Sequence, residues 1–381
     1  MYIKKLVAII LICMLFFVQL PFVHAEGVSV SAVNAVLMEQ ESGRVLFEKD
    51  AHEKKKIASI TKIMTAIIAI ESGKLNDMVT VSDQAYGTEG SSLYLQKGQK
   101  MKLEDLVYGL MLKSGNDAAV AIAEHVGGSL DGFVYLMNQK AEEIGMRNSS
   151  FSNPHGLDNT KKHYSTAYDM ALLTRYAMNN EIFAKISGTK THQAPNPNEA
   201  WDYKWGNKNK MLKLYRYSTG GKTGYTKLAK RTLVSTAEKD GFALVAVTLN
   251  AGDDWNDHIS MFEEAYENYT QTKVLSAGKL KKIKNSFYKN KVAIIEDFEY
   301  PLTKEEQEKI NIQLTLIKPK KAWSNHPEDV PRIVGKAYIK MDEEIIGVRN
   351  VHYEPGDEPT TGVMNSWGKI FLMLLGIREN G

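Results

Sequence analysis

Ser59-Ile60-Thr61-Lys62 opens the stretch that decides the fold, an apolar run that continues to Ile70. Apolar residues recur there at helical spacing, so residues 59–70 are predicted to form a buried helix. Three residues apart on a helix, Ser59 and Lys62 share one face. A serine hydroxyl needs a base to become a nucleophile, and Lys62 can serve only when neutral. Burial and a second cation would lower its pKa. We therefore expect a serine nucleophile at a helix start, where an oxyanion is favoured.

Serine three residues before lysine is not specific by itself, because the spacing recurs at Ser187/Lys190 and three other places. Two further motifs make it specific. Ser114-Gly115-Asn116 lies on a predicted turn between helices 103–112 and 117–126, although these residues are also ordinary turn formers. Lys222-Thr223-Gly224 is expected on a strand at the edge of the site. Its lysine and threonine suit a carboxylate, and Gly224 lets substrate backbone approach.

The order of elements indicates the fold class. A hairpin is predicted at residues 33–47, helices at 133–144 and 166–178, and strands at 233–237 and 242–249 around the Asp240-Gly241 turn. An amphipathic helix then spans residues 255–269. This order predicts an antiparallel sheet with helices packed on it. After residue 275 the sequence consists of short segments in which apolar and polar residues alternate. These segments predict a small β-rich domain.

The two ends have different signals. Lys4 and Lys5, an apolar run and Val23-His24-Ala25 predict a signal peptide over residues 1–25, with an uncleaved anchor as the alternative. Residues 361–381 place Trp367 and other apolar side chains on one helical face, which suits an interfacial anchor or a docked helix.

A cluster of six lysines lies within residues 279–291. We interpret this segment as a solvated linker rather than a membrane-facing surface.

Composition excludes several classes of function. The single cysteine, Cys13, lies inside the predicted signal, so disulfides, thiol catalysis and cysteine-bound metals are not expected. Without Lys4 and Lys5 the net charge falls from +3 to +1, which argues against nucleic-acid binding. No HExxH motif or compact ligand cluster is present, so we expect no metal or other cofactor.

Longer strings carry a family resemblance. Glu89-Gly90-Ser91-Ser92, residues 112–119, Asn153-Pro154-His155-Gly156-Leu157 and Gly221-Lys222-Thr223-Gly224-Tyr225-Thr226 resemble the low-molecular-weight D-alanyl-D-alanine carboxypeptidases of the penicillin-binding protein 5 type, and most nearly the sporulation forms of Bacillus-like bacteria. The resemblance implies an α+β fold: an antiparallel sheet with helices on both faces and a helical subdomain, as in penicillin-recognising serine transpeptidases. It also implies a catalytic domain at 26–275, a small β-rich C-terminal domain at 276–360 and the amphipathic tail at 361–381.

The resemblance also assigns roles to residues. Ser59 would be acylated with Lys62 as its base, and Ser114 would relay a proton. Asn116, Lys222, Thr223, Gly224 and Tyr225 would bind substrate. The oxyanion hole would be the backbone amides of Ser59 and Tyr225, where many relatives carry histidine at the second position. Lys208 would add a cation for the substrate carboxylate.

Several alternatives stay open. His155 suggests a Ser-His-Asp triad, but Lys62 already fills the role of base, so we expect His155 to shape the site. A class A β-lactamase would carry Ser-Asp-Asn and a deacylating glutamate, whereas this chain has Ser114-Gly115-Asn116. A penicillin-binding sensor without turnover is the third possibility.

The expected partners follow from the same resemblance. They are peptidoglycan stem peptides ending in D-Ala-D-Ala, β-lactam antibiotics and, through the tail, a membrane surface. The expected location is the outer face of the cell membrane or the cell wall, with the forespore envelope as one setting.

Overall fold

The computed structural model describes residues 28–158 and 160–354, so the predicted signal peptide and amphipathic tail lie outside the described residues. The chain divides into two compact units, one through Asn268 and one from Tyr269. The predicted boundary at residues 275/276 is therefore seven residues late. The reason is that β10 (Thr270–Leu275) pairs with β13 (Phe298–Leu302), which draws it into the second unit.

The first unit is built on a five-stranded antiparallel sheet in the order β2-β1-β9-β8-β7. Its strands are β1 (Asn34–Glu39), β2 (Val45–Lys49), β7 (Ser218–Thr226), β8 (Lys230–Lys239) and β9 (Phe242–Leu249). The β8–β9 turn places Asp240 and Gly241 at positive φ, 53° and 81°. A two-residue hairpin with a type I′ turn needs this conformation at both positions, and the Asp-Gly pair favours that turn.

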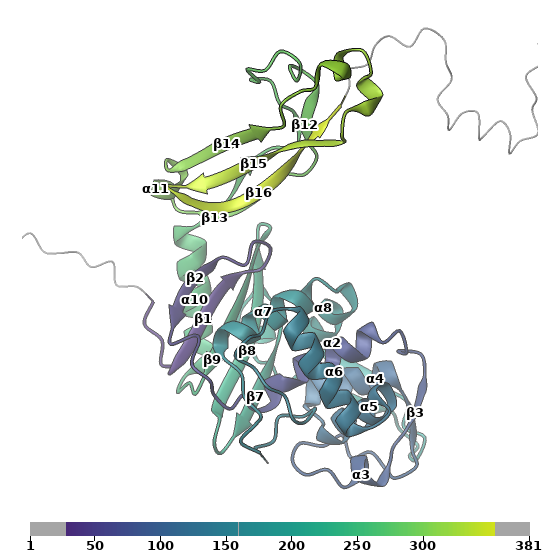
Figure 1. The fold of residues 1–381 in the computed structure, drawn as a ribbon. Helices are drawn as coiled ribbons and strands as arrows, with labels where there is room; N and C mark the ends of the chain where they lie inside the picture. The colour runs from purple at the N-terminus through teal and green to yellow at the C-terminus, as the bar shows by residue number, and fades with distance from the viewer. Residues whose placement is uncertain (1–27, 159, 355–381) are drawn as a thin grey trace, which may run out of the picture. The chain divides into compact units, whose positions relative to one another are not determined.

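Helices cover both faces of this sheet (Figure 1). Val234, Val245 and Val247 face the helical core that includes α7 (Ala167–Met178). The alternate residues of the same strands face α10 (Asp254–Asn268), where His258 bonds to Ser235 and Thr248. Side chains alternate along a strand, so one apolar strand can serve both layers.

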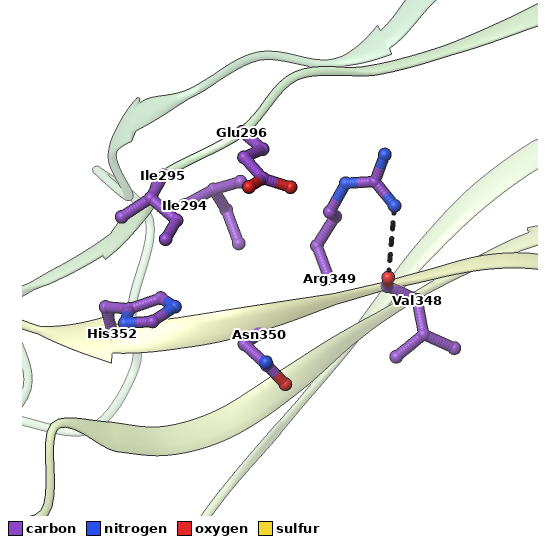
Figure 2. A pocket seen from close by; sticks show the side chains of 7 residues that line it. All are labelled: Ile294, Ile295, Glu296, Val348, Arg349, Asn350 and His352. Atoms are coloured by element: carbon purple, nitrogen blue, oxygen red, sulfur yellow. Dashed lines mark hydrogen bonds between the residues drawn. The ribbon is translucent and has the colours of Figure 1, made fainter. Parts of the chain in front are cut away.

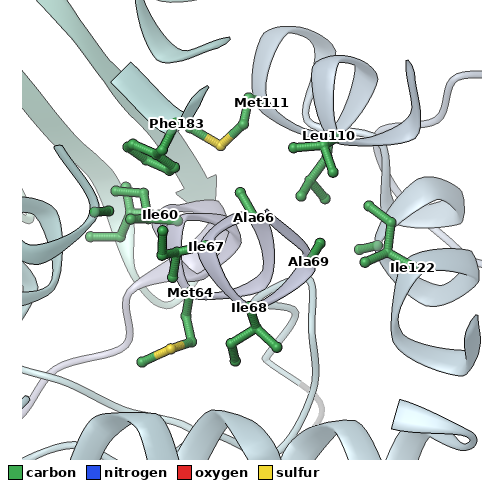
Figure 3. Close-up of a cluster of buried hydrophobic side chains, with 14 of the residues drawn as sticks. Ile60, Met64, Ala66, Ile67, Ile68, Ala69, Leu110, Met111, Ile122 and Phe183 are labelled. Atoms are coloured by element: carbon green, nitrogen blue, oxygen red, sulfur yellow. The ribbon is translucent and has the colours of Figure 1, made fainter. Parts of the chain in front are cut away.

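The helical subdomain surrounds α2 (Lys62–Glu71), whose first nine residues are all buried. Figure 3 shows its apolar side chains among those of α4 (Leu103–Lys113), α5 (Asn116–Gly127) and α8 (Glu181–Gly188). α6 (Leu130–Glu143) packs against α5 and α2. A helix that is apolar on all sides can be stable only at such a position. The 3-10 turn that precedes α2, residues 58–61, contacts β7 and β8 of the sheet.

Shorter elements complete the first unit. They are η1 (Ala58–Thr61), β3 (Met78–Thr80), α3 (Asp83–Tyr86), β4 (Lys100–Lys102), β5 (Thr191–Ala194), β6 (Tyr203–Gly206) and α9 (Met211–Leu214). The predicted helices and strands of this unit are all present, with ends shifted by a few residues.

The second unit is β-rich, as expected. Its main sheet has the order β11-β12-β16-β15-β14, all neighbours antiparallel. The elements are β11 (Gly278–Lys279), β12 (Val292–Ile294), α11 (Lys304–Gln307), β14 (Ile310–Leu316), η2 (Lys321–Ser324), η3 (Pro327–Asp329), β15 (Ile333–Met341) and β16 (Glu344–Tyr353). Tyr288, Trp323 and Val351 centre its own core. No helix among the described residues is long and apolar enough to cross a membrane.

Candidate active site

Ser59 lies in a 3-10 turn, η1, that runs directly into α2. The α-helix begins at Lys62, three residues later than predicted, so the first turn of the predicted helix is 3-10. Ala58, just before the serine, has φ 49°, a left-handed conformation that an alanine adopts at some cost. Such strain persists only where the surroundings enforce it, and it clusters at functional sites.

Lys62 is fully buried, and its side-chain nitrogen lies within hydrogen-bond distance of three oxygens. Nζ lies 3.1 Å from Ser59 Oγ, 2.7 Å from Asn116 Oδ1 and 2.7 Å from the His155 carbonyl oxygen. The orientation of the Asn116 amide is set by its other end, because Nδ2 donates to the Glu89 carbonyl at 2.6 Å. Oδ1 therefore faces Lys62 as an acceptor.

This arrangement can hold Lys62 in its neutral form. The Asn116 and His155 oxygens can only accept, and together they take both protons of a neutral amine. The lone pair is then left for the Ser59 hydroxyl. Burial lowers the pKa of Lys62 well below its usual value, and the charges of Lys222 and Lys208 lower it further, while Asp117 opposes them.

The second motif forms the expected turn between α4 and α5. Ser114 ends α4 at φ 66°, the left-handed conformation that closes a helix. Its hydroxyl lies 3.1 Å from Lys222 Nζ, and the next helix begins at Asn116. The turn thus connects the first motif, through Asn116, with the third, through Ser114.

The third motif lies on a strand, as predicted, and this strand is β7, at one edge of the sheet. Lys222 is buried, and its Nζ also donates to the Thr223 carbonyl at 2.7 Å. An added Cβ on Gly224 would come within 2.9 Å of the Ser59 backbone nitrogen, so only glycine lets the strand approach the nucleophile this closely. Thr223 is half-buried, whereas the Tyr225 side chain is 65 % exposed.

Two cations raise the positive potential here. Burial, and then the charge of Lys208, lower the pKa of Lys222 to about 7. Lys208 lies on the chain after β6, and its Nζ bonds to Ser91 Oγ at 3.3 Å. Partial desolvation and Lys113 lower the pKa of Lys208 as well. A substrate carboxylate would relieve this repulsion.

Sequence reasoning missed a chain of hydrogen bonds behind the nucleophile. Ser152 N donates to His163 Nδ1 at 3.1 Å, so His163 Nε2 carries the proton and donates to Thr61 Oγ1 at 2.8 Å. Thr61 donates to the Ala58 carbonyl at 2.8 Å. The only available signal was a threonine inside the first motif.

Asp117 was missed for a similar reason. Its buried carboxylate accepts from the Ser92 hydroxyl and from the backbone nitrogens of Leu93 and Leu95, at 2.6 to 3.2 Å. It thereby fixes the loop whose Glu89 and Ser91 carbonyls hold Asn116. An aspartate beside the motif could have indicated this, but the loop is remote in sequence.

His155 contributes its backbone to the site. Its carbonyl binds Lys62, its Nδ1 accepts from Leu157 N at 3.2 Å, and burial beside Lys62 lowers its pKa to about 3. Its contact with Lys62 is made by the backbone and not by the imidazole, and a role in shaping the site stays a prediction. Among the described residues, no three metal-binding side chains lie close enough together to hold an ion.

The second unit has a hollow of about 250 Å³, drawn in Figure 2. Its polar side chains are Glu296, Arg349, Asn350 and His352. The guanidinium of Arg349 is already bonded to the carbonyls of Asp297 and Val348. Neither a serine nor a lysine lines this hollow.

Known proteins share both units. Residues 22–253 match the peptidase S11 family model described as D-alanyl-D-alanine carboxypeptidase. Residues 269–355 match the one described as penicillin-binding protein 5, C-terminal domain. The second match begins where the structure divides the chain.

Individual relatives agree. The chain is 34% identical over 307 residues to D-alanyl-D-alanine carboxypeptidase DacF of Bacillus subtilis, covering 74% of this chain and 78% of the relative. It is 36% identical over 250 residues to DacC of Escherichia coli, covering 60% and 59%. Penicillin binding protein 5 from Haemophilus influenzae superposes with TM-score 0.70 at 25% identity, covering 86% of this chain and 97% of that structure. The α+β fold and the family resemblance are confirmed, and the chain belongs to the peptidase S11 family of D-alanyl-D-alanine carboxypeptidases.

Proposed function

We propose that this protein removes the terminal D-alanine from peptidoglycan stem peptides that end in D-Ala-D-Ala, through an ester on Ser59. The observation that carries the proposal is the surroundings of Lys62 Nζ. Lys62 Nζ donates hydrogen bonds to two oxygens that can only accept, and its third neighbour is the Ser59 hydroxyl. This geometry supports a neutral base poised beside a nucleophile.

In the acylation step, Lys62 Nζ takes the Ser59 proton while Oγ attacks the carbonyl carbon of the penultimate D-alanine. The oxyanion that forms would accept from the backbone amides of Ser59 and Tyr225. When the C–N bond breaks, the leaving amine needs a proton. That proton is the one Lys62 took from Ser59, and we assign its relay to Ser114, whose hydroxyl accepts from the charged Lys222 Nζ at 3.1 Å. The products are free D-alanine and an acyl-enzyme, and water then releases the shortened peptide.

Substrate would lie along the outer edge of β7. Asn209 and Ser187 bond to the backbone of Gly220 and Gly221, which leaves the following residues of this edge strand for a ligand. An extended peptide can pair with such an edge. Its terminal carboxylate would then meet Lys222 and Thr223, with Lys208 as an additional cation. β-Lactams carry a carboxylate and a reactive amide, so the same residues should accept them.

The test combines penicillin labelling with turnover of a D-Ala-D-Ala peptide. The wild-type chain should show one adduct at Ser59 by mass spectrometry and should release D-alanine. Ser59→Ala should lose both reactions, and Lys62→Met should retain the fold but lose nearly all acylation, since the hydroxyl loses its base. Labelling at another serine, or D-alanine release by Ser59→Ala, would contradict the mechanism.

The same experiment separates the alternatives. Labelling at Ser59 without peptide turnover would indicate a penicillin-binding sensor. Rapid hydrolysis of the penicillin ester would indicate a β-lactamase, which we do not expect because Ser114-Gly115-Asn116 lacks the aspartate of that class.

We also propose export through residues 1–25 and attachment of residues 361–381 to the outer face of the cytoplasmic membrane, in a cell-wall role that includes sporulation. The composition of both segments supports this. A chain ending at Thr361 should stay active and move from the membrane to the soluble fraction. Expression confined to vegetative growth would contradict the sporulation role.

A further inference from the structure

One end of the second unit is strongly basic. Six exposed lysines lie on the segment between β11 and β12 and at its borders, namely Lys279, Lys281, Lys282, Lys284, Lys289 and Lys291. The sequence alone favoured a solvated linker for this segment. The structure instead folds it onto the core, because Tyr288 is fully buried and its hydroxyl donates to the Ile317 carbonyl at 3.0 Å.

That contact brings a second basic segment to the same end. Lys318, Lys320 and Lys321 are exposed and lie immediately beyond β14. Aromatic side chains connect the two segments, because the ring centroids of Phe287 and Trp323 are 6.2 Å apart. We call these nine lysines the basic end. None of them forms an ion pair with any residue in 28–158 or 160–354.

Acidic side chains at this end are fewer. Glu328 and Asp329 lie on η3, and Glu328 is 3.2 Å from His326. Glu296, Asp297 and Glu354 follow β12 and β16, and Asp297 is already paired with Lys273. Uncompensated lysines repel one another, and such a cluster gains most from a polyanionic surface.

The basic end is also where the described chain stops. Tyr353 pairs with Val292, and Glu354 N donates to the Lys291 carbonyl at 2.8 Å. The amphipathic residues 361–381 therefore follow within a few residues of the cluster. Along the sheet, α11 and the β15–β16 turn lie at the opposite end (Figure 1). A weak hydrophobic anchor holds a protein stably only when a second signal, such as a polybasic surface, acts beside it.

We propose that the basic end binds the headgroups of anionic lipids and acts together with the tail to hold the second unit on the bilayer. This inference rests on the proposed membrane attachment of residues 361–381. Each lysine near an anionic bilayer strengthens binding about fivefold. The attraction extends over about one Debye length, so it weakens steeply with salt.

The test is sedimentation with lipid vesicles, either zwitterionic phosphatidylcholine alone or a mixture with anionic phosphatidylglycerol. The protein runs from Glu26 to Gly381, which retains every described element. The variant is Lys281→Gln/Lys282→Gln/Lys284→Gln, whose side chains are exposed and make no described contact. Partitioning to anionic vesicles should fall on the order of 100-fold. Partitioning to neutral vesicles should not change.

The matched control neutralises three lysines at the opposite end of the same sheet, Lys304→Gln/Lys309→Gln/Lys340→Gln. It has the same net charge as the variant and should keep most of the anionic binding. Equal losses in the two triple variants would show a net-charge effect, and no loss in either would show that the tail acts alone. Both results overturn the proposal.

A chain ending at Thr361 separates this inference from the attachment of the tail. If the tail does not bind lipid, the full and shortened chains will bind anionic vesicles equally, and both will lose binding with the lysine variant. Isolated peptidoglycan is the remaining test surface. Lysine-dependent binding to it, with vesicle binding unchanged, would assign the basic end to the wall polymer and refute lipid binding.

Discussion

At the scale of single residues, the orientation of the Ala58–Ser59 peptide group determines where the Ser59 N–H points. A peptide bond is planar and trans, so the Ala58 carbonyl and the Ser59 N–H point in opposite directions. Thr61 Oγ1 and the close approach of Gly156 fix the carbonyl. The Ser59 N–H, which we assign to the oxyanion hole, is thereby aimed into the site. His163 in turn holds the Thr61 hydroxyl.

Thr61→Val therefore should lower the acylation rate by on the order of 100-fold, because it removes the hydroxyl and keeps the shape. Penicillin acylation and peptide kcat and KM are the measurements. We expect kcat to fall with little change in KM, since the carboxylate receptor is untouched. Thr61→Ser restores the hydroxyl and should recover most of the activity. A purely structural threonine would instead lower the melting temperature and leave kcat of the folded fraction unchanged.

The two buried lysines predict a bell-shaped pH dependence of kcat/KM. Acylation needs neutral Lys62, so activity falls at acid pH as Lys62 gains a proton. Carboxylate binding needs charged Lys222, whose pKa in the free enzyme is about 7, so activity falls as the pH rises beyond that value. Lys208 lowers the pKa of both lysines.

Lys208→Gln should therefore move both limbs of the profile to higher pH, whatever it does to the maximum. The measurement is kcat/KM for a D-Ala-D-Ala peptide from about pH 5 to about pH 10. Lys204→Gln, an exposed change on β6, should leave the profile in place. A profile of Lys208→Gln that coincides with wild type would show that Lys208 does not act on these two groups.

At the scale of elements, the site depends on loops that pack against η1 at backbone distance. Gly156, on the loop before α7, has φ 87°, and a Cβ there would lie 1.9 Å from the Ala58 carbonyl oxygen. No rotation of a side chain can relieve a clash with backbone. The glycine is thus required both by its conformation and by the lack of space.

Gly156→Ala should abolish acylation or prevent folding, and Gly145→Ala is the matched control. Gly145 has a similar φ of 84° but nothing within 4 Å of an added Cβ. It should cost only about 1 kcal/mol of unfolding free energy and leave penicillin labelling intact. Thermal unfolding and labelling of both variants give the comparison. Equal behaviour of the two variants would mean that the contact with Ala58 is unimportant.

At the scale of the whole molecule, buried histidines make the first unit sensitive to acid. Desolvation lowers the pKa of His155, His163 and His258 from 6.5 to about 3. Below about pH 6.5 the unfolded chain therefore binds protons that the folded chain does not. The free energy of unfolding should fall as the pH drops from 6.5 toward 3, and these three groups contribute no slope above 6.5.

Calorimetry at several pH values tests this expectation. The transition of the first unit should move to lower temperature on acidification more than that of the second unit, because all three histidines belong to the first. His258→Gln should reduce the slope, whereas His326→Gln, an exposed change in the second unit, should not. A first unit whose melting temperature is constant across this range would contradict the assigned neutral state.

Short-range patterns were sufficient for the elements and for the three motifs. The apolar run of α2, the Asp240-Gly241 turn and the glycine of Lys222-Thr223-Gly224 each express a local rule, so the sequence by itself predicted the helix, the hairpin and a strand for the third motif. The family strings then indicated the chemistry of Ser59 and Lys62. These predictions needed no contact between distant residues.

Tertiary structure alone decided the rest, because each remaining feature is a contact between segments far apart in the chain. The surroundings of Lys62 combine Asn116 and the His155 carbonyl with two cations 146 and 160 residues away, whose charges help to lower its pKa. Thr61 and His163 meet across 102 residues. The pairing of β10 with β13 moved the boundary between the units, and the burial of Tyr288 turned a predicted linker into one side of a basic surface. Periodicity reports which residues are buried, but it does not report which segments they are buried against.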